Sequence, residues 1–179
     1  YRVIINDADH KWRNPSKALN VGIRHSTMCN CLVVSPESLM DGDLIKTMVR
    51  QKTNDNYVIG KLKQGTIKDG LLDPKIKDVG KHYGSIMFSR EHAENITGYN
   101  EHFYFWGADD DDFRERLTRS GIARKEIDSG VTHYKIHGKH DGVKRTLINS
   151  VLLTRRSLKS NKVWGRDFNR MIVLRKNAK

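Results

Sequence analysis

Short apolar runs alternate with amphipathic stretches along most of this chain. Apolar runs of strand length occupy residues 1–5, 31–34, 57–60, 84–89 and part of 127–136. Apolar residues at helical spacing occupy residues 16–25, 37–52, 90–97, 109–120 and 141–159. Because strands and helices alternate, the pattern predicts an α/β protein.

In two stretches the apolar residues show no regular spacing. Residues 61–81 are polar and rich in Gly and Lys, which predicts a loop. From Ser160 onward the chain is basic and irregular, with Trp164, Phe168 and Met171 as candidate anchors to the core. No repeat, low-complexity segment or second domain is visible, so we expect one domain over residues 1–179.

The composition fits one domain with a modest core, since the chain has 179 residues and a mean hydropathy of −0.67. No apolar run approaches the ~18 residues that a membrane-spanning helix needs, and no signal peptide is visible. Cys29 and Cys31 are only two residues apart at the start of a predicted strand, which argues against a disulfide between them. We therefore expect a reduced, cytoplasmic protein.

The chain is strongly basic, with a formal net charge of +12 and a pI of about 9.8. Such a charge fits nucleic acid, anionic lipid head groups or anionic small molecules such as sugar nucleotides. No nucleic-acid motif is present, and the run of four acids described next would repel phosphate. We therefore exclude nucleic acid as the partner and keep peripheral membrane association through the basic surface as an alternative.

The most unusual local feature is a run of four carboxylates, Asp109 to Asp112, at the start of a predicted helix that carries Phe113 and Leu117 on one face. Helix capping and the helix dipole explain one or two acids there, with Asp109 or Asp112 as the cap. Four adjacent acids repel one another and point in different directions. We therefore expect two of them to face a cleft, where they suit a general base, hydroxyl recognition or a metal.

The residues around this run resemble a known family. Gly98-Tyr-Asn-Glu101 followed by Trp106-Gly-Ala-Asp-Asp-Asp-Asp-Phe113 resembles GT-A glycosyltransferases, in particular family-two enzymes and the C-terminal region of β-1,4-galactosyltransferases, whose pattern is Trp-Gly-Gly-Glu-Asp-Asp-Asp. The resemblance implies a GT-A fold, a mixed and mostly parallel sheet flanked by helices. It also implies an inverting hexosyltransferase of polysaccharide biosynthesis, which uses a nucleotide-sugar donor, expected to be a UDP-sugar, and a glycan or other hydroxyl acceptor.

The resemblance also assigns roles by position. Asp110 matches the base and Asp111 a second acid that binds the acceptor. Trp106, Gly107 and Asp109 would complete the acceptor site. A second match, from Ala18 to Ile23, resembles an Ala-x-Asn-x-Gly helix, in which Asn20 contacts the donor region or braces the nucleotide pocket. Alternatively, Asn20 is a helix side chain that bonds to a neighbouring loop.

The chain departs from the family at two places. Nothing resembles the first strand–loop–helix of the family, so Tyr1 would enter the fold at the third strand, and the chain would be the whole catalytic domain or its C-terminal two-thirds. The acid-x-acid metal motif reads Ser35-Pro36-Glu37, which keeps only the second acid. These departures favour the alternative of a non-catalytic relative that binds a carbohydrate or nucleotide.

A histidine cluster follows the last predicted strand. His133 and His137 are four residues apart, and the resemblance implies a histidine at this point that completes a metal site. Together with Glu37, His137 (or, second, His133) would hold Mn²⁺ or Mg²⁺. The alternatives are surface histidines in a basic loop and, for Glu37, an acid in the first turn of a helix.

Overall fold

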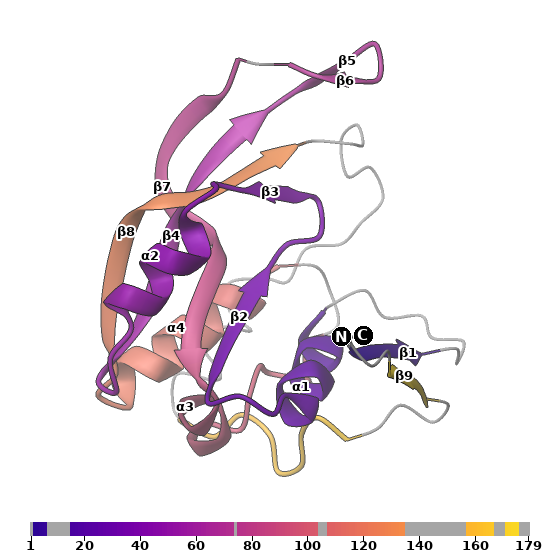
Figure 1. Cartoon of the computed structure of the whole chain (residues 1–179). Helices are drawn as coiled ribbons and strands as arrows, with labels where there is room; N and C mark the ends of the chain where they lie inside the picture. The colour runs from indigo at the N-terminus through magenta and orange to yellow at the C-terminus, as the bar shows by residue number, and fades with distance from the viewer. Residues whose placement is uncertain are drawn as a thin grey trace.

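The computed structural model describes residues 2–6, 15–73, 75–103, 107–134, 157–166 and 171–175. Its centre is a five-stranded sheet in the order β2-β7-β4-β8-β3 (Figure 1). The strands are β2 (Asn30–Val34), β7 (Lys77–Ser89), β4 (Asn56–Gly65), β8 (Ala123–Tyr134) and β3 (Ser38–Met40). Strands β4 and β8 pair in parallel, and the other three pairings are antiparallel.

Helices cover both faces of this sheet. Side chains alternate between faces along a strand, so Tyr57 and Ile59 of β4 lie on one face and Val58 on the other. The Val58 face packs against α2 (Leu44–Gln51) through Leu44 and Met48. The opposite face packs against α1 (Ser16–His25), α3 (Arg90–Asn95) and α4 (Asp109–Arg119).

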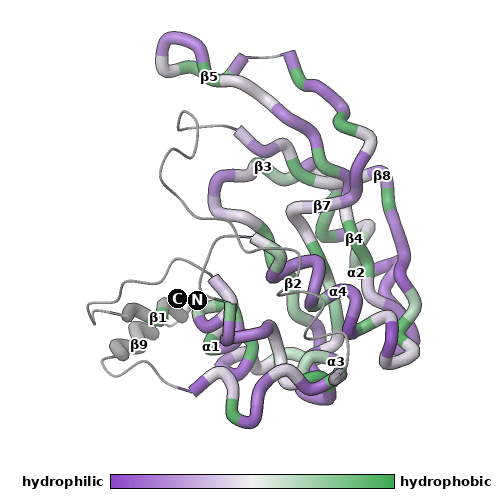
Figure 2. Tube along the Cα trace, turned by 180° about the vertical axis from the view of Figure 1, so that it is seen from behind, coloured by the Kyte–Doolittle hydropathy of each residue, from purple (hydrophilic) through white to green (hydrophobic). Residues whose placement is uncertain are grey.

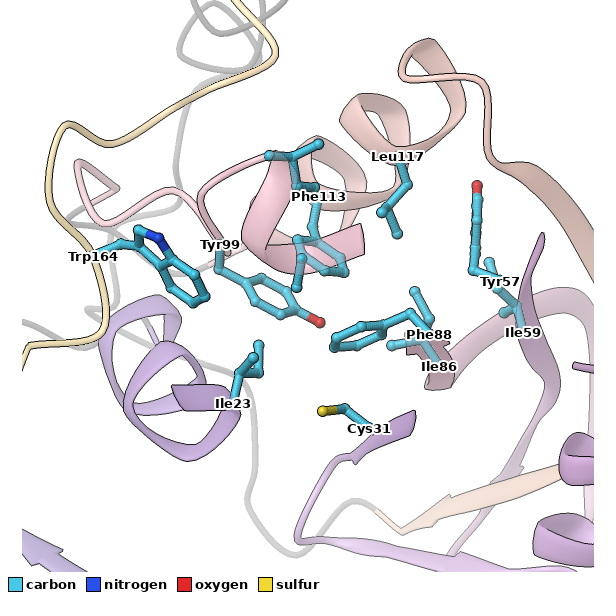
Figure 3. Close-up of a cluster of buried hydrophobic side chains, with 12 residues drawn as sticks. Ile23, Cys31, Tyr57, Ile59, Ile86, Phe88, Tyr99, Phe113, Leu117 and Trp164 are labelled. Atoms are coloured by element: carbon cyan, nitrogen blue, oxygen red, sulfur yellow. The ribbon is translucent and has the colours of Figure 1, made fainter. Parts of the chain in front are cut away.

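The core under α4 is aromatic (Figure 3). Phe113 stacks on Tyr99 at a ring-centroid distance of 4.0 Å and meets Phe88 edge-on at 4.9 Å. Leu117 is fully buried one turn further along the helix, as its spacing from Phe113 predicts. Trp164 joins the same cluster and is therefore one of the predicted anchors that the structure confirms.

Two smaller sheets lie outside the main one. Strand β1 (Arg2–Asn6) pairs antiparallel with β9 (Met171–Arg175). Strands β5 (Ile67–Lys68) and β6 (Leu71–Leu72) form a short hairpin between β4 and β7. Within the described residues, no helix combines the length and apolar character needed to cross a membrane.

The structure confirms an α/β fold with a mixed sheet flanked by helices, together with the predicted helix at Ser16–His25 and a helix that begins at Asp109. The description "mostly parallel" is wrong for the five-stranded sheet. Strands β4 and β8 are parallel because β7, which is antiparallel to β4, returns the chain to the end of the sheet where β4 starts, and β8 begins there after α3 and α4.

Two local predictions are also wrong. The helix expected at 37–52 begins only at Leu44, because Ser38–Met40 instead pair with β8 as an edge strand and Asp41 to Asp43 form the turn between them. The loop expected at 61–81 contains the arms of a long hairpin, whose backbone pairing involves residues distant in the chain and leaves no local signal. The helix expected at 141–159 lies almost entirely outside the described residues, and Ser157 to Lys159 are not helical.

Candidate functional site

A tight left-handed turn sets the start of α4. Gly107 has a φ of 85° and Ala108 a φ of 69°. The left-handed region costs an alanine roughly 1–2 kcal/mol, whereas glycine adopts it freely. The galactosyltransferase pattern quoted above has a second glycine where this chain has Ala108. After this strained turn, the first residues of α4 face the sheet. The amide of Asp112 donates a hydrogen bond to the Ala108 carbonyl at 3.0 Å.

The four acids that follow point in different directions, because successive helical residues are about 100° apart. Asp109 is buried, Asp110 is half-buried, and the Asp111 side chain is 62% exposed. The Asp112 side chain is completely buried. The four acids therefore lie in different environments, as expected for a run of four adjacent acids.

Asp112 forms a buried ion pair with Arg116. The Arg116 Nε donates to Asp112 Oδ2 at 2.8 Å, and Nη2 lies 2.8 Å from the same oxygen. The guanidinium also donates from Nη1 to the Ile96 carbonyl at 2.8 Å. Helix α4 begins without a side-chain cap, so Asp112 stabilises the helix through this pair rather than as the expected cap.

Asp109 and Asp110 are held in an environment that disfavours their charge. Burial, and then the neighbouring Asp110 carboxylate, raises the pKa of Asp109 to about 7. Burial also raises the pKa of Asp110, against the opposing effect of the nearby Arg114 guanidinium. Carboxyl groups whose pKa is raised toward neutrality are suited to accept and release a proton near neutral pH.

Asp110 lines a small pocket at the sheet. The other lining residues are Val33, Ser35, Gly84, Ser85, Ile86 and Arg114. The pocket has a volume of about 30 Å³, which is far below the ~300 Å³ or more typical of ligand pockets. The Ser85 hydroxyl is buried and has no hydrogen-bond partner within the described part of the chain, so a polar group in this pocket would find both a carboxylate and a hydroxyl.

Arg114 links this pocket to its rim. Its guanidinium bonds to Asp111 at 2.6 Å and lies 4.2 Å from the centroid of the Tyr83 ring. Burial, and then the charges of Asp110 and Asp111, raises the pKa of Tyr83 to about 12, so Tyr83 keeps its proton. Sequence reasoning missed Ser85, Tyr83 and Arg114, because they come from two distant elements and none belongs to a recognisable motif.

Asn20 braces the loop that precedes the site. Its amide nitrogen donates to the Tyr99 carbonyl and to Glu101 Oε1, each at 2.8 Å, and its oxygen accepts from the Tyr99 amide at 2.7 Å. Asn161, which sequence reasoning missed, donates to the Tyr99 carbonyl at 2.7 Å. Gly98 has a φ of 68°, and a Cβ there would clash with Asn20 and Trp164. The structure thus shows the alternative in which Asn20 bonds to a neighbouring loop, and its contact with the donor region or a nucleotide pocket stays a prediction.

Two of the predicted metal ligands meet. His133 Nε2 lies 3.0 Å from Glu37 Oε1, because β3 pairs with the end of β8 and brings residues 96 positions apart together. Glu37 lies in the turn before β3, not in a helix as one alternative proposed. No group of three metal-ligating side chains occurs among the residues with described positions. His137 and Trp106, both predicted site residues, lie outside them.

Comparisons with known proteins agree with this architecture. A family model described as the N-terminal domain of galactosyltransferase matches residues 70–141, less than half of the chain but including all four acids of α4. Comparison with curated protein sequences gave no match.

The similar solved structures include two of Drosophila β1,4-galactosyltransferase 7. The catalytic domain in complex with xylobiose is 18% identical, with a TM-score of 0.56 over 85% of this chain and 64% of that chain. A mutant in complex with manganese, UDP-Gal and xylobiose is 19% identical, with a TM-score of 0.57 over 87% of this chain and 65% of that one. The likeness shows a GT-A fold, and the chain spans just under two thirds of the length of these structures.

The buried ion pair can be tested against its exposed neighbour. Asp112→Ala leaves the Arg116 charge buried without its partner, and we expect it to lower the free energy of unfolding by about 3–5 kcal/mol. Asp111→Ala removes an ion pair on the same turn whose carboxylate is exposed, and the Asp110 carboxyl still lies near Arg114, so the cost should be clearly smaller. Urea denaturation of both variants measures the difference. Equal effects would contradict a structural role specific to Asp112.

The raised pKa of Asp109 predicts a pH-dependent stability. The folded state favours the protonated carboxyl, so the stabilisation is complete below the ordinary pKa of 3.8 and is lost as pH rises through about 7. Asp109→Asn removes this loss, so its free energy of unfolding should rise relative to that of the wild type between acidic and mildly alkaline pH, by a difference on the order of 2–4 kcal/mol. Urea denaturation of both proteins across this pH range measures the difference. A difference that does not change with pH would exclude the raised pKa.

Proposed function

We propose that this chain carries the catalytic part of an inverting GT-A glycosyltransferase. The proposed reaction moves a hexose from a nucleotide-diphosphate sugar, with a UDP-sugar as the donor, to a hydroxyl of a glycan acceptor. The observation that carries the proposal is the position of Asp110, a carboxyl of raised pKa that opens into a pocket at the N-terminus of α4 within a GT-A fold. The two solved relatives are complexes with xylobiose and, in one, UDP-Gal, which supports this choice of substrates.

Asp110 is the proposed general base. Its carboxylate accepts the proton of the acceptor hydroxyl, whose oxygen forms a bond to the anomeric carbon of the donor sugar. The bond between that carbon and the diphosphate oxygen breaks as the new bond forms, so the anomeric configuration inverts. A sugar ring does not fit in a pocket of about 30 Å³, so in this proposal the acceptor lies at the mouth of the pocket and only its reacting hydroxyl meets Asp110.

The residues around Asp110 position the acceptor. The Ser85 hydroxyl, buried in the same pocket, is a proposed partner for the acceptor oxygen. Asp111 is exposed at the rim, where it suits a second hydroxyl of the acceptor. Gly107 contributes the left-handed turn that precedes Asp110, and Asp109 lies beside it with a pKa that the Asp110 carboxylate helps to raise.

The proposed divalent cation would be held by Glu37 and His133. A carboxylate oxygen and an imidazole nitrogen are donors that Mn²⁺ accepts, and their 3.0 Å separation allows both to reach one ion. A cation bound there would offset the charge of the leaving diphosphate. The first acid of the family's metal motif is Ser35 here, so this site has fewer protein ligands than the family pattern.

A second candidate function is binding without catalysis. The serine at position 35, where the family's metal motif has its first acid, favours it. Titration calorimetry with nucleotide sugars in the presence of Mn²⁺ measures donor binding, and a product assay measures turnover. A non-catalytic relative binds the donor but gives no product with any acceptor, so the two measurements together distinguish the two functions.

The role of Asp110 predicts a specific loss of activity. Asp110→Asn keeps the shape of the side chain but removes the proton acceptor, so turnover of UDP-galactose with a xyloside acceptor should fall by roughly 10²–10⁴ while the melting temperature is kept or rises. The matched control is Glu115→Gln, which removes an acid from the same helix away from the pocket. Wild-type turnover by Asp110→Asn would refute the assignment of the base.

The proposed metal ligands predict a loss of Mn²⁺ affinity. Glu37→Gln and His133→Ala should each weaken Mn²⁺ binding roughly 10-fold or more, since each removes one ligand of a small set. Electron paramagnetic resonance of free Mn²⁺ measures binding without any need for activity. The control is Glu126→Gln, which disrupts a similar pair, His82 Nδ1 to Glu126 Oε2 at 3.3 Å, elsewhere on the sheet. Unchanged affinity in both test variants would remove the metal site from Glu37 and His133.

A further inference from the structure

Several exposed apolar side chains of the described chain gather on one hairpin. Within the described residues, ten large hydrophobic side chains are exposed, and four of them, Ile67, Leu71, Leu72 and Ile76, lie in a stretch of ten residues around the β5–β6 turn. Leu71 is the most exposed of all at 73%. We call residues 66–73 and 75–77 the apolar tip. Neither the core nor the proposed transferase site involves these side chains.

The apolar tip projects away from the body of the protein (Figure 1). Strands β5 and β6 extend beyond the paired ends of β4 and β7, and the four helices lie at a distance from them (Figures 1 and 2). The turn between Lys68 and Leu71 contains Asp69 and Gly70, which both have positive φ and reverse the chain tightly. The tip can therefore contact a flat surface without a change in the rest of the fold.

Positive charge surrounds the tip. Residues 61–81 contain six lysines and three aspartates. Two of the aspartates are engaged within the hairpin, since Asp73 pairs with Lys68 at 3.2 Å and Asp78 with Lys61 at 2.6 Å. Lys75, Lys77 and Lys81 are exposed, and no ion pair is seen for them in the described part of the chain. The tip is thus apolar at its end and cationic at its base.

We propose that this hairpin docks the protein on an anionic lipid bilayer, with Leu71 and Leu72 inserted at the level of the head groups and the lysines against lipid phosphates. Apolar side chains beyond a basic collar are the arrangement that interfacial binding requires. A stable protein partner fits less well, because a specific interface buries ~800 Å² on each side, and four partly exposed side chains on a narrow hairpin offer less.

The test measures sedimentation of the whole chain with vesicles of phosphatidylcholine alone or mixed with phosphatidylserine. The wild type should bind the mixed vesicles, and increasing salt should weaken the binding. Leu71→Ser/Leu72→Ser should weaken it by roughly tenfold or more for each leucine. The matched control, Ile45→Ser/Val49→Ser, removes two similarly exposed apolar side chains from α2 and should bind like the wild type.

Two further experiments separate the contribution of the lysine charges from the insertion of the apolar tip into the bilayer. Lys75→Gln/Lys77→Gln should reduce the affinity for the mixed vesicles and the steepness of its salt dependence. A tryptophan at the tip, in Leu71→Trp, should shift its emission to the blue on mixed vesicles. Circular dichroism of each variant confirms that it is folded.

Three outcomes would overturn the proposal: no binding to mixed vesicles, wild-type binding by the folded double serine variant, or self-association of the chain in solution that the double serine variant abolishes. None of these depends on transferase activity, so the proposal fails or stands independently of the proposed function.

Discussion

The site depends on one buried ion pair, between Asp112 and Arg116 on successive turns of α4. Arg116 is the largest fully buried side chain among the described residues. A guanidinium in this position is tolerated only when its charge is neutralised. Asp112 supplies the charge, and the Ile96 carbonyl accepts a further hydrogen bond. The pair thus ties α4 to the end of α3 while Phe113 fixes the helix against the sheet.

The directions of the other acids follow from that constraint. With Asp112 turned inward, the helical repeat leaves Asp111 exposed and brings Asp109 and Asp110 to the edge of the sheet. Their charges are disfavoured by burial, and the left-handed Ala108 adds strain at the same point. Such costs are typical of functional sites, where the surrounding structure offsets them. One run of four identical residues therefore provides a structural ion pair, a partly buried carboxyl of raised pKa and an exposed charge at the rim.

The sequence predicts the local elements of this site better than its non-local ones. The spacing of Phe113 and Leu117 and the acid run predict α4 and its buried face, because these signals lie within a few turns. The pairing of β3 with β8, which brings Glu37 to His133, involves residues 96 positions apart. Ser85 lies in the pocket because of the register of β7. This strand begins seven residues before the start that the sequence predicts. Long-range pairing is decided by packing, which no local pattern records.

The central claim is that α4 holds Asp110 in a poorly solvated pocket where it keeps its proton to higher pH than an ordinary aspartate. Carbon-13 NMR of the aspartate carboxyl groups, titrated with pH and assigned with Asp109→Asn and Asp110→Asn, tests it directly. We predict that the Asp110 carboxyl titrates clearly above 3.8, the pKa of an ordinary aspartate, both in the wild type and in Asp109→Asn, because burial is the main cause. An Asp110 signal that titrates at or below that value in both proteins would contradict this view of the site.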